Sequence, residues 1–420
     1  MARLPRFPAL SRRQWQVLLL VSSATFFDYY DITLISMALK QIQQDLLIPE
    51  ENLGLVGAIV QFGKIPAIFV ALAADRFGRR PVLLVTIVGY TIFTGLSGLA
   101  PEAISFVLLQ FIARTFATAE IILAHVVITE EMDAEVRGWA VGMMGTLAAL
   151  GSGMAYVLFA FIEVLPGGWR TMYLVGLAPL VLLIFLRRNL PETERFEKVE
   201  AEQEDMAGKM GLHLTPLLQL IRMYPGRLMA IGGVIFFFYF MQEPAYFLAP
   251  KYLQETHDWK PYYISAFAPL GALSIWMNMI GGWMGDRYGR RITTMVFLTL
   301  TSIAGLALFT GSGFLFLGLS MVAVSALAAA SRTNLHVYSA ELFPTSYRST
   351  AGGALMVLNS LGGMIGLAVQ SLLFRVIGSH PIPLALFSLA LLPMLVCMAF
   401  LPETSRRSLE EIAPEREDKT

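Results

Sequence analysis

Long apolar stretches recur along the whole chain, and short polar segments separate them. A helix needs roughly 20 apolar residues to cross the hydrocarbon core of a bilayer. The pattern predicts twelve membrane-spanning helices near residues 15–38, 53–74, 81–100, 103–129, 138–163, 169–187, 228–250, 262–285, 292–311, 313–338, 350–375 and 382–401. Most connections are short, as for antiparallel neighbours in an all-α bundle.

One polar segment is much longer than the others and runs from Arg188 to Arg227. Its middle is rich in Glu and Lys and cannot lie in lipid. We therefore expect an N-terminal six-helix bundle (1–190), a cytoplasmic linker (191–226) and a C-terminal six-helix bundle with a short tail (227–420). The first apolar stretch is too long for a cleavable signal peptide, and no small-residue cleavage site follows it.

Composition narrows the class of protein. Of 420 residues, 56% are hydrophobic and 15% are charged, and the formal net charge is zero. These values exclude a basic nucleic-acid binder and a disordered chain, and they argue strongly against a soluble protein. The single cysteine, Cys397, forms no intramolecular disulfide, and no zinc-ligand spacing occurs. We expect no metal site and no cofactor.

The distribution of Lys and Arg predicts the orientation. If both termini lie inside, the inner segments hold about 23 of the 31 Lys and Arg residues, and the outer loops hold about 5. The remaining ones, Lys64, Arg114 and Arg332, lie within spans. We therefore expect a multi-pass protein of the cell inner membrane, embedded in lipid, with both termini cytoplasmic.

The two halves repeat each other at an offset of 211 residues. AspArgPheGlyArgArg at 75–80 corresponds to AspArgTyrGlyArgArg at 286–291, and ProGluThr at 191–193 to ProGluThr at 402–404. Because six spans separate the copies, both begin on the same side of the membrane, so the repeats are parallel. Two pseudosymmetric bundles of this kind predict a central cavity that opens to each side in turn.

These motifs resemble the signature of the major facilitator superfamily. TyrSerAlaGluLeuPheProThrSerTyrArg at 338–348 and ProGluThrSerArgArgSerLeuGluGlu at 402–411 are similar to its sugar-porter-like branch, which includes metabolite–proton symporters. The AspXTyrAsp pattern at 28–31 resembles the first span of aromatic-acid–proton symporters. The resemblance implies the twelve-helix fold, alternating access and function as a monomer.

The resemblance also implies two clusters of acids and bases that act as gates at the inner side. Gly78 and Gly289 would provide the tight turns that the loops need. The alternative is that the bases only set the topology. The expected gating residues are Asp75, Arg76, Arg80, Glu130, Arg137 and Glu192, with Asp286, Arg287, Arg291, Glu341, Arg348 and Glu403 as their counterparts.

Charges inside the spans are candidates for proton coupling, because each costs roughly 2.5–3.5 kcal/mol to insert. Asp28 and Asp31 are three residues apart on one helix, and two close carboxylates resist double ionisation. Arg114 and Glu120 lie in the fourth span. We expect these four groups to couple protons to transport; a static ion pair between Asp31 and Arg114 is the alternative.

Other polar groups in the spans are candidate substrate ligands. Arg332 has the planar fork that suits a carboxylate, although it could equally pair with Glu243 or Glu120. Pro244 is expected to break the seventh span beside Glu243. The expected substrate-binding residues are Lys64, His125, Tyr239, Gln242, Glu243, Arg332, His336, Asn359 and Ser360. For Lys64, partnering with Asp28 or Asp31 is the alternative.

These features predict a secondary transporter that carries a small organic metabolite, most simply a carboxylate, together with protons. A sugar or polyol carrier is the first alternative, and a multidrug or organic-ion exporter is the second. A transport-dead nutrient sensor belongs to another class, and its usual long cytoplasmic tail is absent from this sequence. No HisGluXXHis or GlyXSerXGly motif supports an enzyme.

Overall fold

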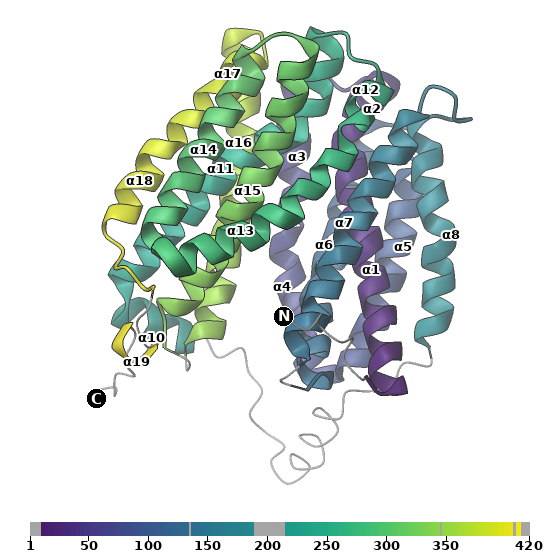
Figure 1. The fold of residues 1–420 in the computed structure, drawn as a ribbon. Helices are drawn as coiled ribbons and strands as arrows, with labels where there is room; N and C mark the ends of the chain where they lie inside the picture. The colour runs from purple at the N-terminus through teal and green to yellow at the C-terminus, as the bar shows by residue number, and fades with distance from the viewer. Residues whose placement is uncertain (1–9, 134–135, 189–214, 345–346, 406–408, 413–420) are drawn as a thin grey trace, which may run out of the picture. The chain divides into compact units, whose positions relative to one another are not determined.

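The computed structural model describes residues 10–133, 136–188, 215–344, 347–405 and 409–412. Every regular element in these ranges is a helix (Figure 1). Twelve helical segments there are long and apolar enough to cross a membrane. Helices suit lipid because they bond every backbone group internally where no water is present. The predicted all-α fold with twelve spans is therefore confirmed.

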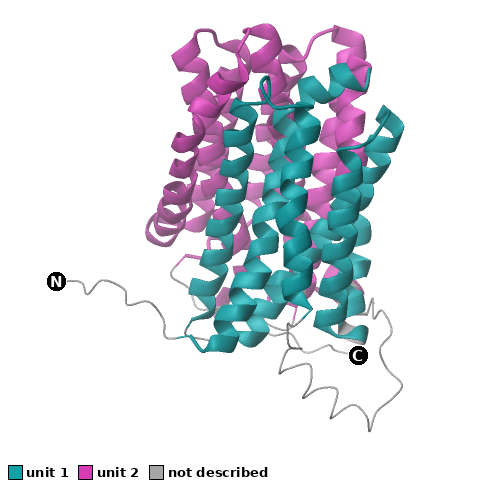
Figure 2. Cartoon of the chain, turned by 90° about the vertical axis from the view of Figure 1, so that its right-hand side faces the viewer, with its two compact units in different colours: residues 1–47, 63–211 teal, residues 48–62, 212–420 magenta. Residues whose placement is uncertain are grey.

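The chain divides into two compact units, which Figure 2 colours separately. Unit 1 comprises Met1–Leu47 and Gly63–Gly211, and unit 2 comprises Ile48–Phe62 and Leu212–Thr420. The described helices of unit 1 are α1 (Arg12–Met37), α2 (Leu39–Asp45), α4 (Lys64–Phe77), α5 (Arg79–Ser97), α6 (Ala103–Glu131), α7 (Arg137–Ala160) and α8 (Trp169–Arg187).

The helices of unit 2 include part of the second span. The first half of that span, α3, belongs to unit 2, and the second half, α4, belongs to unit 1. The helices of unit 2 are η1 (Glu50–Asn52), α3 (Leu53–Phe62), α10 (Thr215–Met223), α11 (Pro225–Thr256), α12 (Pro261–Ala266), η2 (Ala268–Ala272), α13 (Leu273–Tyr288), α14 (Arg290–Thr310), α15 (Phe314–Glu341), α16 (Arg348–Ile377), α17 (Pro381–Leu386), η3 (Phe387–Ala390), α18 (Leu391–Ala399) and α19 (Leu409–Ile412).

The units therefore do not follow the expected sequence boundaries in every detail. Residues 48–62 group with unit 2 although they precede the linker. Helix α10 begins at Thr215, inside the segment 191–226 that we expected to be linker. The part of that linker up to residue 214 lies outside the described residues.

The internal repeat is visible in the packing within each unit. In unit 1, α1 packs on α7 and α5 on α6; in unit 2, α11 packs on α16 and α14 on α15. Gly151 of α7 faces the backbone of Phe26 so closely that an added Cβ would overlap its carbonyl oxygen. Gly362 of α16, exactly one repeat later, faces the carbonyl of Phe236 in the same way. Small residues thus let the paired helices approach each other.

Two further expectations concern glycine and proline. Gly78 has φ of 91° and Gly289 has φ of 110°, which confirms that both turns need the positive φ that glycine adopts readily. The expected break at Pro244 is wrong: α11 runs from Pro225 to Thr256 through Pro244 and Pro250. Proline removes one backbone donor, which membrane helices tolerate when neighbouring groups compensate.

The tight contact of α1 with α7 predicts that Gly151→Ala destabilises the protein. The added methyl must displace the backbone at Phe26, which costs about 1–3 kcal/mol. The matched control is Gly153→Ala, since nothing lies within 4 Å of a Cβ at Gly153. Thermal unfolding of the purified proteins should show a lower midpoint for the first variant only. Equal midpoints would contradict the close contact.

Candidate functional site

The interior of unit 1 holds a group of charged side chains that we call the buried charge cluster: Asp28, Asp31, Arg114, Glu120 and Arg187. All five are between 0% and 7% exposed. They lie on α1, α6 and α8. Helix α1 packs against both α6 and α8 as well as α7, and this central position buries its two aspartates.

Asp28 occupies the middle of the cluster. It interacts electrostatically with Glu120, Arg187, Asp31 and Arg114. Neither of its carboxyl oxygens accepts a hydrogen bond from any described residue. A carboxylate that is fully removed from solvent and has no hydrogen-bond donor is expensive to keep ionised. The structure thus brings together the four residues expected to couple protons.

The charges of Asp31 and Arg114 act on each other. Arg114 is the main charged group that acts on Asp31. The Oδ1 atom of Asp31 and the Nε atom of Arg114 have no hydrogen-bond partner among the described residues. The charges of Asp31 and Arg114 also act on two tyrosine hydroxyl groups, those of Tyr90 and Tyr173. Free bonding capacity on both partners allows the pair to rearrange.

Glu120 and Arg187 form a fully buried ion pair. Thr86 of α5 also donates a hydrogen bond to Glu120. Arg187 donates two further bonds to the carbonyl oxygen of Leu20, from Nη2 at 3.0 Å and from Nε at 3.3 Å. One ion pair therefore joins α1, α5, α6 and α8.

Sequence reasoning missed Arg187. It stands at the end of the sixth span next to Arg188, where the long polar segment begins. Its neighbour is exposed, whereas Arg187 is 0% exposed. The sequence signal that points to Arg187 is Glu120 itself, because an acid within a span needs a base within reach.

Several expected substrate ligands lie in unit 2, on α11 and α16. Gln242 is 7% exposed and Ser360 is 4% exposed, whereas Tyr239, Glu243 and Asn359 are half-buried. Glu243 accepts a hydrogen bond of 2.6 Å from Gln61 of α3. Gly363 of α16 lies against the Glu243 side chain and leaves no room for a Cβ. These contacts hold Glu243 among three helices of one unit.

The remaining expected ligands are less enclosed. Arg332 on α15 and Lys64 at the start of α4 are half-buried. His125 and His336 are exposed, and His125 Nδ1 lies 2.8 Å from the carbonyl oxygen of Ile121 in its own helix. The described contacts assign neither histidine a place in the buried charge cluster.

The first gating cluster contains a residue that the sequence analysis did not include. Arg79 donates hydrogen bonds to Glu130 from Nη2 at 3.1 Å and from Nε at 3.3 Å. Its Nη1 atom donates to the carbonyl oxygen of Ala74. Arg137 donates to the carbonyl of Met132. The side chains of Asp75 and Arg76, and the whole of Glu192, lie outside the described residues.

The second gating cluster repeats this arrangement one offset later. Arg290, the counterpart of Arg79, pairs with Asp286 and with Glu341 at 3.3 Å. Glu403 accepts the backbone N–H groups of Arg290 and Arg291. The expected base, Arg287, has its guanidinium 5.7 Å from the ring centre of Trp283.

Three more of the expected gating residues donate to backbone carbonyl groups, and Thr404 joins the second gating cluster. Thr404 bonds Glu341, so the ProGluThr segment reaches the same cluster. Arg80 donates to the carbonyl oxygen of Arg188, Arg291 to that of Ala399 and Arg348 to that of Ala340. These bases therefore also fasten helix ends within their own units.

A further group of ion pairs, separate from the buried charge cluster and from the two gating clusters, lies in unit 2 and joins η1 to α11. Lys251, only 1% exposed, lies 2.7 Å from Glu50 and also pairs with Glu255. His380 Nε2 is 2.6 Å from the same Glu50 oxygen. Lys251 is not among the expected site residues, and in the structure it anchors the segment 48–62 to α11 through Glu50.

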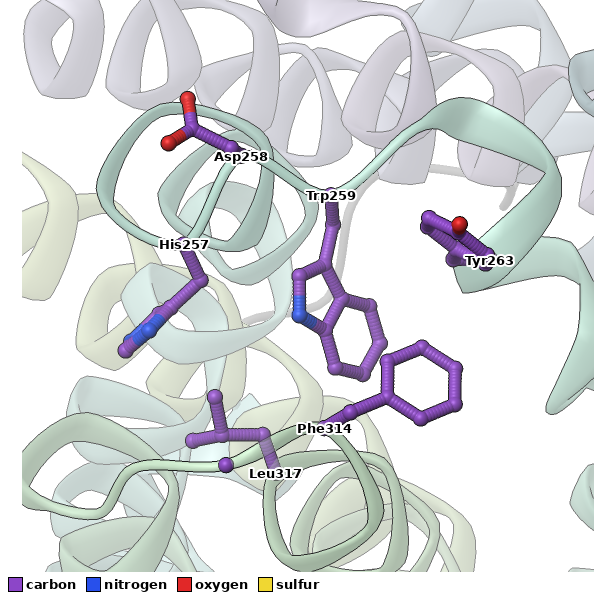
Figure 3. A pocket seen from close by; sticks show the side chains of 7 residues that line it. His257, Asp258, Trp259, Tyr263, Phe314 and Leu317 are labelled. Carbon is purple, nitrogen blue, oxygen red and sulfur yellow. The ribbon is translucent and has the colours of Figure 1, made fainter.

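A cavity of about 460 Å³ opens between the α11–α12 connection and the start of α15 (Figure 3). Trp259 forms its wall, with its ring 4.7 Å from that of Phe314 and 5.7 Å from that of Phe267. His257, Asp258 and Tyr263 complete the lining with Gly313 and Leu317. None of the expected substrate ligands lines it, so we do not assign the substrate to this cavity.

Twelve candidate spans in two compact units, with the buried charge cluster inside unit 1, define a polytopic membrane protein. Residues 21–277 and 270–419 match the sequence profile of the Major Facilitator Superfamily. The chain therefore belongs to this superfamily.

Known proteins agree with this assignment. The chain is 26% identical over 356 residues to the sialic acid transporter NanX of Escherichia coli, covering 80% of this chain and 82% of that protein. It is 22% identical over 385 residues to the benzoate transport protein of Acinetobacter baylyi, covering 84% and 82%. Its fold matches the inward-open xylose transporter XylE of E. coli with a TM-score of 0.75, at 20% identity, covering 95% and 99%.

The second gating cluster predicts that Arg290→Gln destabilises unit 2. The substitution leaves Asp286 and Glu341 without their base, at a cost of about 1–3 kcal/mol. Thermal unfolding should show a lower midpoint, and uptake should fall with it. Arg222→Gln is the control, because Arg222 is exposed on α10. A variant at Arg290 as stable and active as the control would contradict a role for the cluster.

Proposed function

We propose that this transporter is a symporter that carries a small organic carboxylate together with protons by alternating access. The observation that carries the proposal is the buried charge cluster, in which three carboxyl groups face two guanidinium groups. An uncompensated carboxylate is costly in a dry interior. One acid of the cluster is therefore neutral while it carries a proton. Once it has released the proton, it needs a positively charged or hydrogen-bonding partner.

The carboxylate cargo has its own support. Arg114 and Arg332 are bases within spans, and an arginine offers a carboxylate two parallel hydrogen bonds. The relatives NanX and the benzoate transport protein are named for organic acids. The likeness to a xylose transporter concerns the fold alone, so it does not favour a sugar as cargo.

The proposal includes location and orientation. The excess of Lys and Arg in alternate connections supports an inner-membrane protein with both termini in the cytoplasm. Membership of the Major Facilitator Superfamily supports function as a monomer. The gating clusters at Glu130 and Glu341 are proposed to bias the equilibrium between the two open states.

Uptake into proteoliposomes tests the proposal, with radiolabelled benzoate as the probe and xylose as the competing sugar. An inward proton gradient should drive benzoate above its equilibrium distribution, and a protonophore should abolish this accumulation. Xylose should neither accumulate nor compete. Accumulation of xylose without benzoate would replace the carboxylate proposal by the sugar-carrier alternative.

Asp31→Asn should abolish proton-driven accumulation of benzoate while benzoate counterflow, which needs no net proton movement, continues. Asp31 is the more accessible of the two acids on α1, and its charge interacts with that of Arg114, so we expect it to link the cluster to the transported anion. Counterflow in the same vesicles is the control for folding. Undiminished accumulation would remove Asp31 from proton coupling.

Arg332→Gln should weaken benzoate binding by about tenfold, equivalent to about 1.4 kcal/mol, because the amide lacks the positive charge. Arg332→Lys is the matched control, because it keeps the charge without the planar fork. Its affinity for benzoate should lie between those of the wild type and Arg332→Gln. Binding is measured by the concentration dependence of counterflow. Equal affinities of all three proteins would exclude Arg332 as the carboxylate ligand.

A further inference from the structure

The charges of the buried charge cluster do not balance. Glu120 and Arg187 pair with each other, which leaves Asp28 and Asp31 with the single base Arg114. Burying one carboxylate without a compensating charge is costly, whereas a protonated carboxyl is neutral. One of the three acids must therefore hold a proton in the low-dielectric interior.

Glu120 is the acid of the cluster that accepts the most hydrogen bonds. Arg187 and Thr86 both donate to it, and Arg187 is itself held by the carbonyl oxygen of Leu20. A carboxylate that accepts hydrogen bonds in its charged form is stabilised in that form. Asp28 differs, because neither of its oxygens has a hydrogen-bond partner in the described parts of the chain.

The internal repeat provides an independent comparison. Adding 211 to Glu120 and Arg187 gives Ser331 and Met398, and both of these are 0% exposed. The same two buried positions thus pack well without an ion pair. Asp28 corresponds to Tyr239, so the half that lacks this acid also lacks the pair. Packing alone does not account for Glu120 and Arg187.

We propose that Arg187 is a positioning residue for proton coupling: by holding Glu120 as a fixed carboxylate, it leaves Asp28 as the group that binds and releases the transported proton. The inference rests on the proposed proton symport. One proton joins a carboxylate oxygen of Asp28 from one side of the membrane and leaves the same atom to the other side. No other bond forms or breaks.

The pH dependence of this step follows from the groups around Asp28. Helix α7 beyond Arg137 contains no charged residue. The titratable and charged groups that face Asp28 are Asp31 on its own helix, Tyr90 on α5, Arg114 and Glu120 on α6, and Arg187 on α8.

Arg187→Met tests the proposal in proteoliposomes with benzoate as the probe. Glu120 then competes for the proton, and the cluster releases it only at higher pH. We expect accumulation at pH 7 to fall about tenfold, and the pH of half-maximal accumulation to rise by about one unit. Counterflow should continue. The matched control is Arg188→Met, whose exposed side chain lies outside the cluster.

The double variant Glu120→Ser/Arg187→Met, which copies the second half of the chain, keeps the test decisive if the single variant does not fold. It should recover accumulation, and adding Asp28→Asn should abolish accumulation again while counterflow continues. Counterflow without accumulation in the double variant would assign the proton to Glu120 and overturn the proposal.

Two other results would also overturn it. The first is a pH profile of Arg187→Met that equals that of the wild type. The second is loss of both accumulation and counterflow in the single and the double variant, because the Glu120–Arg187 pair would then be purely structural. Failure of the proposed function looks different, because the wild-type protein itself would then show no proton-driven accumulation.

Discussion

A charge buried among membrane-spanning helices must meet an opposite charge, a hydrogen-bond partner or a proton, and this requirement organises unit 1. The ion pair of Glu120 with Arg187 meets it most completely. Arg187 ends α8 and also reaches the carbonyl of Leu20, while Thr86 approaches Glu120 from α5. Four helices are thereby held around one pair. The acids of α1 lie beside it with fewer partners, so a fixed framework surrounds a small number of groups that can change charge.

Close helix packing makes this burial possible. Gly151 lets α7 contact the backbone at Phe26, two residues before Asp28. The contact covers the turn that carries both aspartates, which are 0% and 5% exposed. In unit 2, Gly362 meets Phe236 just before Tyr239 and Gln242. The repeat therefore preserves the backbone contact and changes the side chains that the contact encloses.

Hydropathy and the repeat were sufficient to predict the twelve spans, the two similar halves and the turns at Gly78 and Gly289, because these depend on chain-wide or backbone properties. Individual partners were harder to predict. Arg187 stands beside an exposed arginine, so its burial depends on where α8 ends relative to Glu120. The bases bonded to Glu130 and Glu341 are Arg79 and Arg290, a choice made by the geometry of the turn. Pro244 does not interrupt α11, because tertiary packing outweighs the lost donor.

The two halves share helix pairings and yet differ in charge, and this difference bears on function. At the positions that match Asp28, Asp31, Arg114, Glu120 and Arg187, the second half has Tyr239, Gln242, Ser325, Ser331 and Met398. Neutral residues therefore satisfy the fold at all five places. Each charge costs roughly 2.5–3.5 kcal/mol to place in a membrane. Five charged side chains that only filled space would therefore lower the stability of the bundle with no functional benefit. The neutral residues at these five positions show what packing requires there, and the charges that replace them in unit 1 are those on which proton coupling can act.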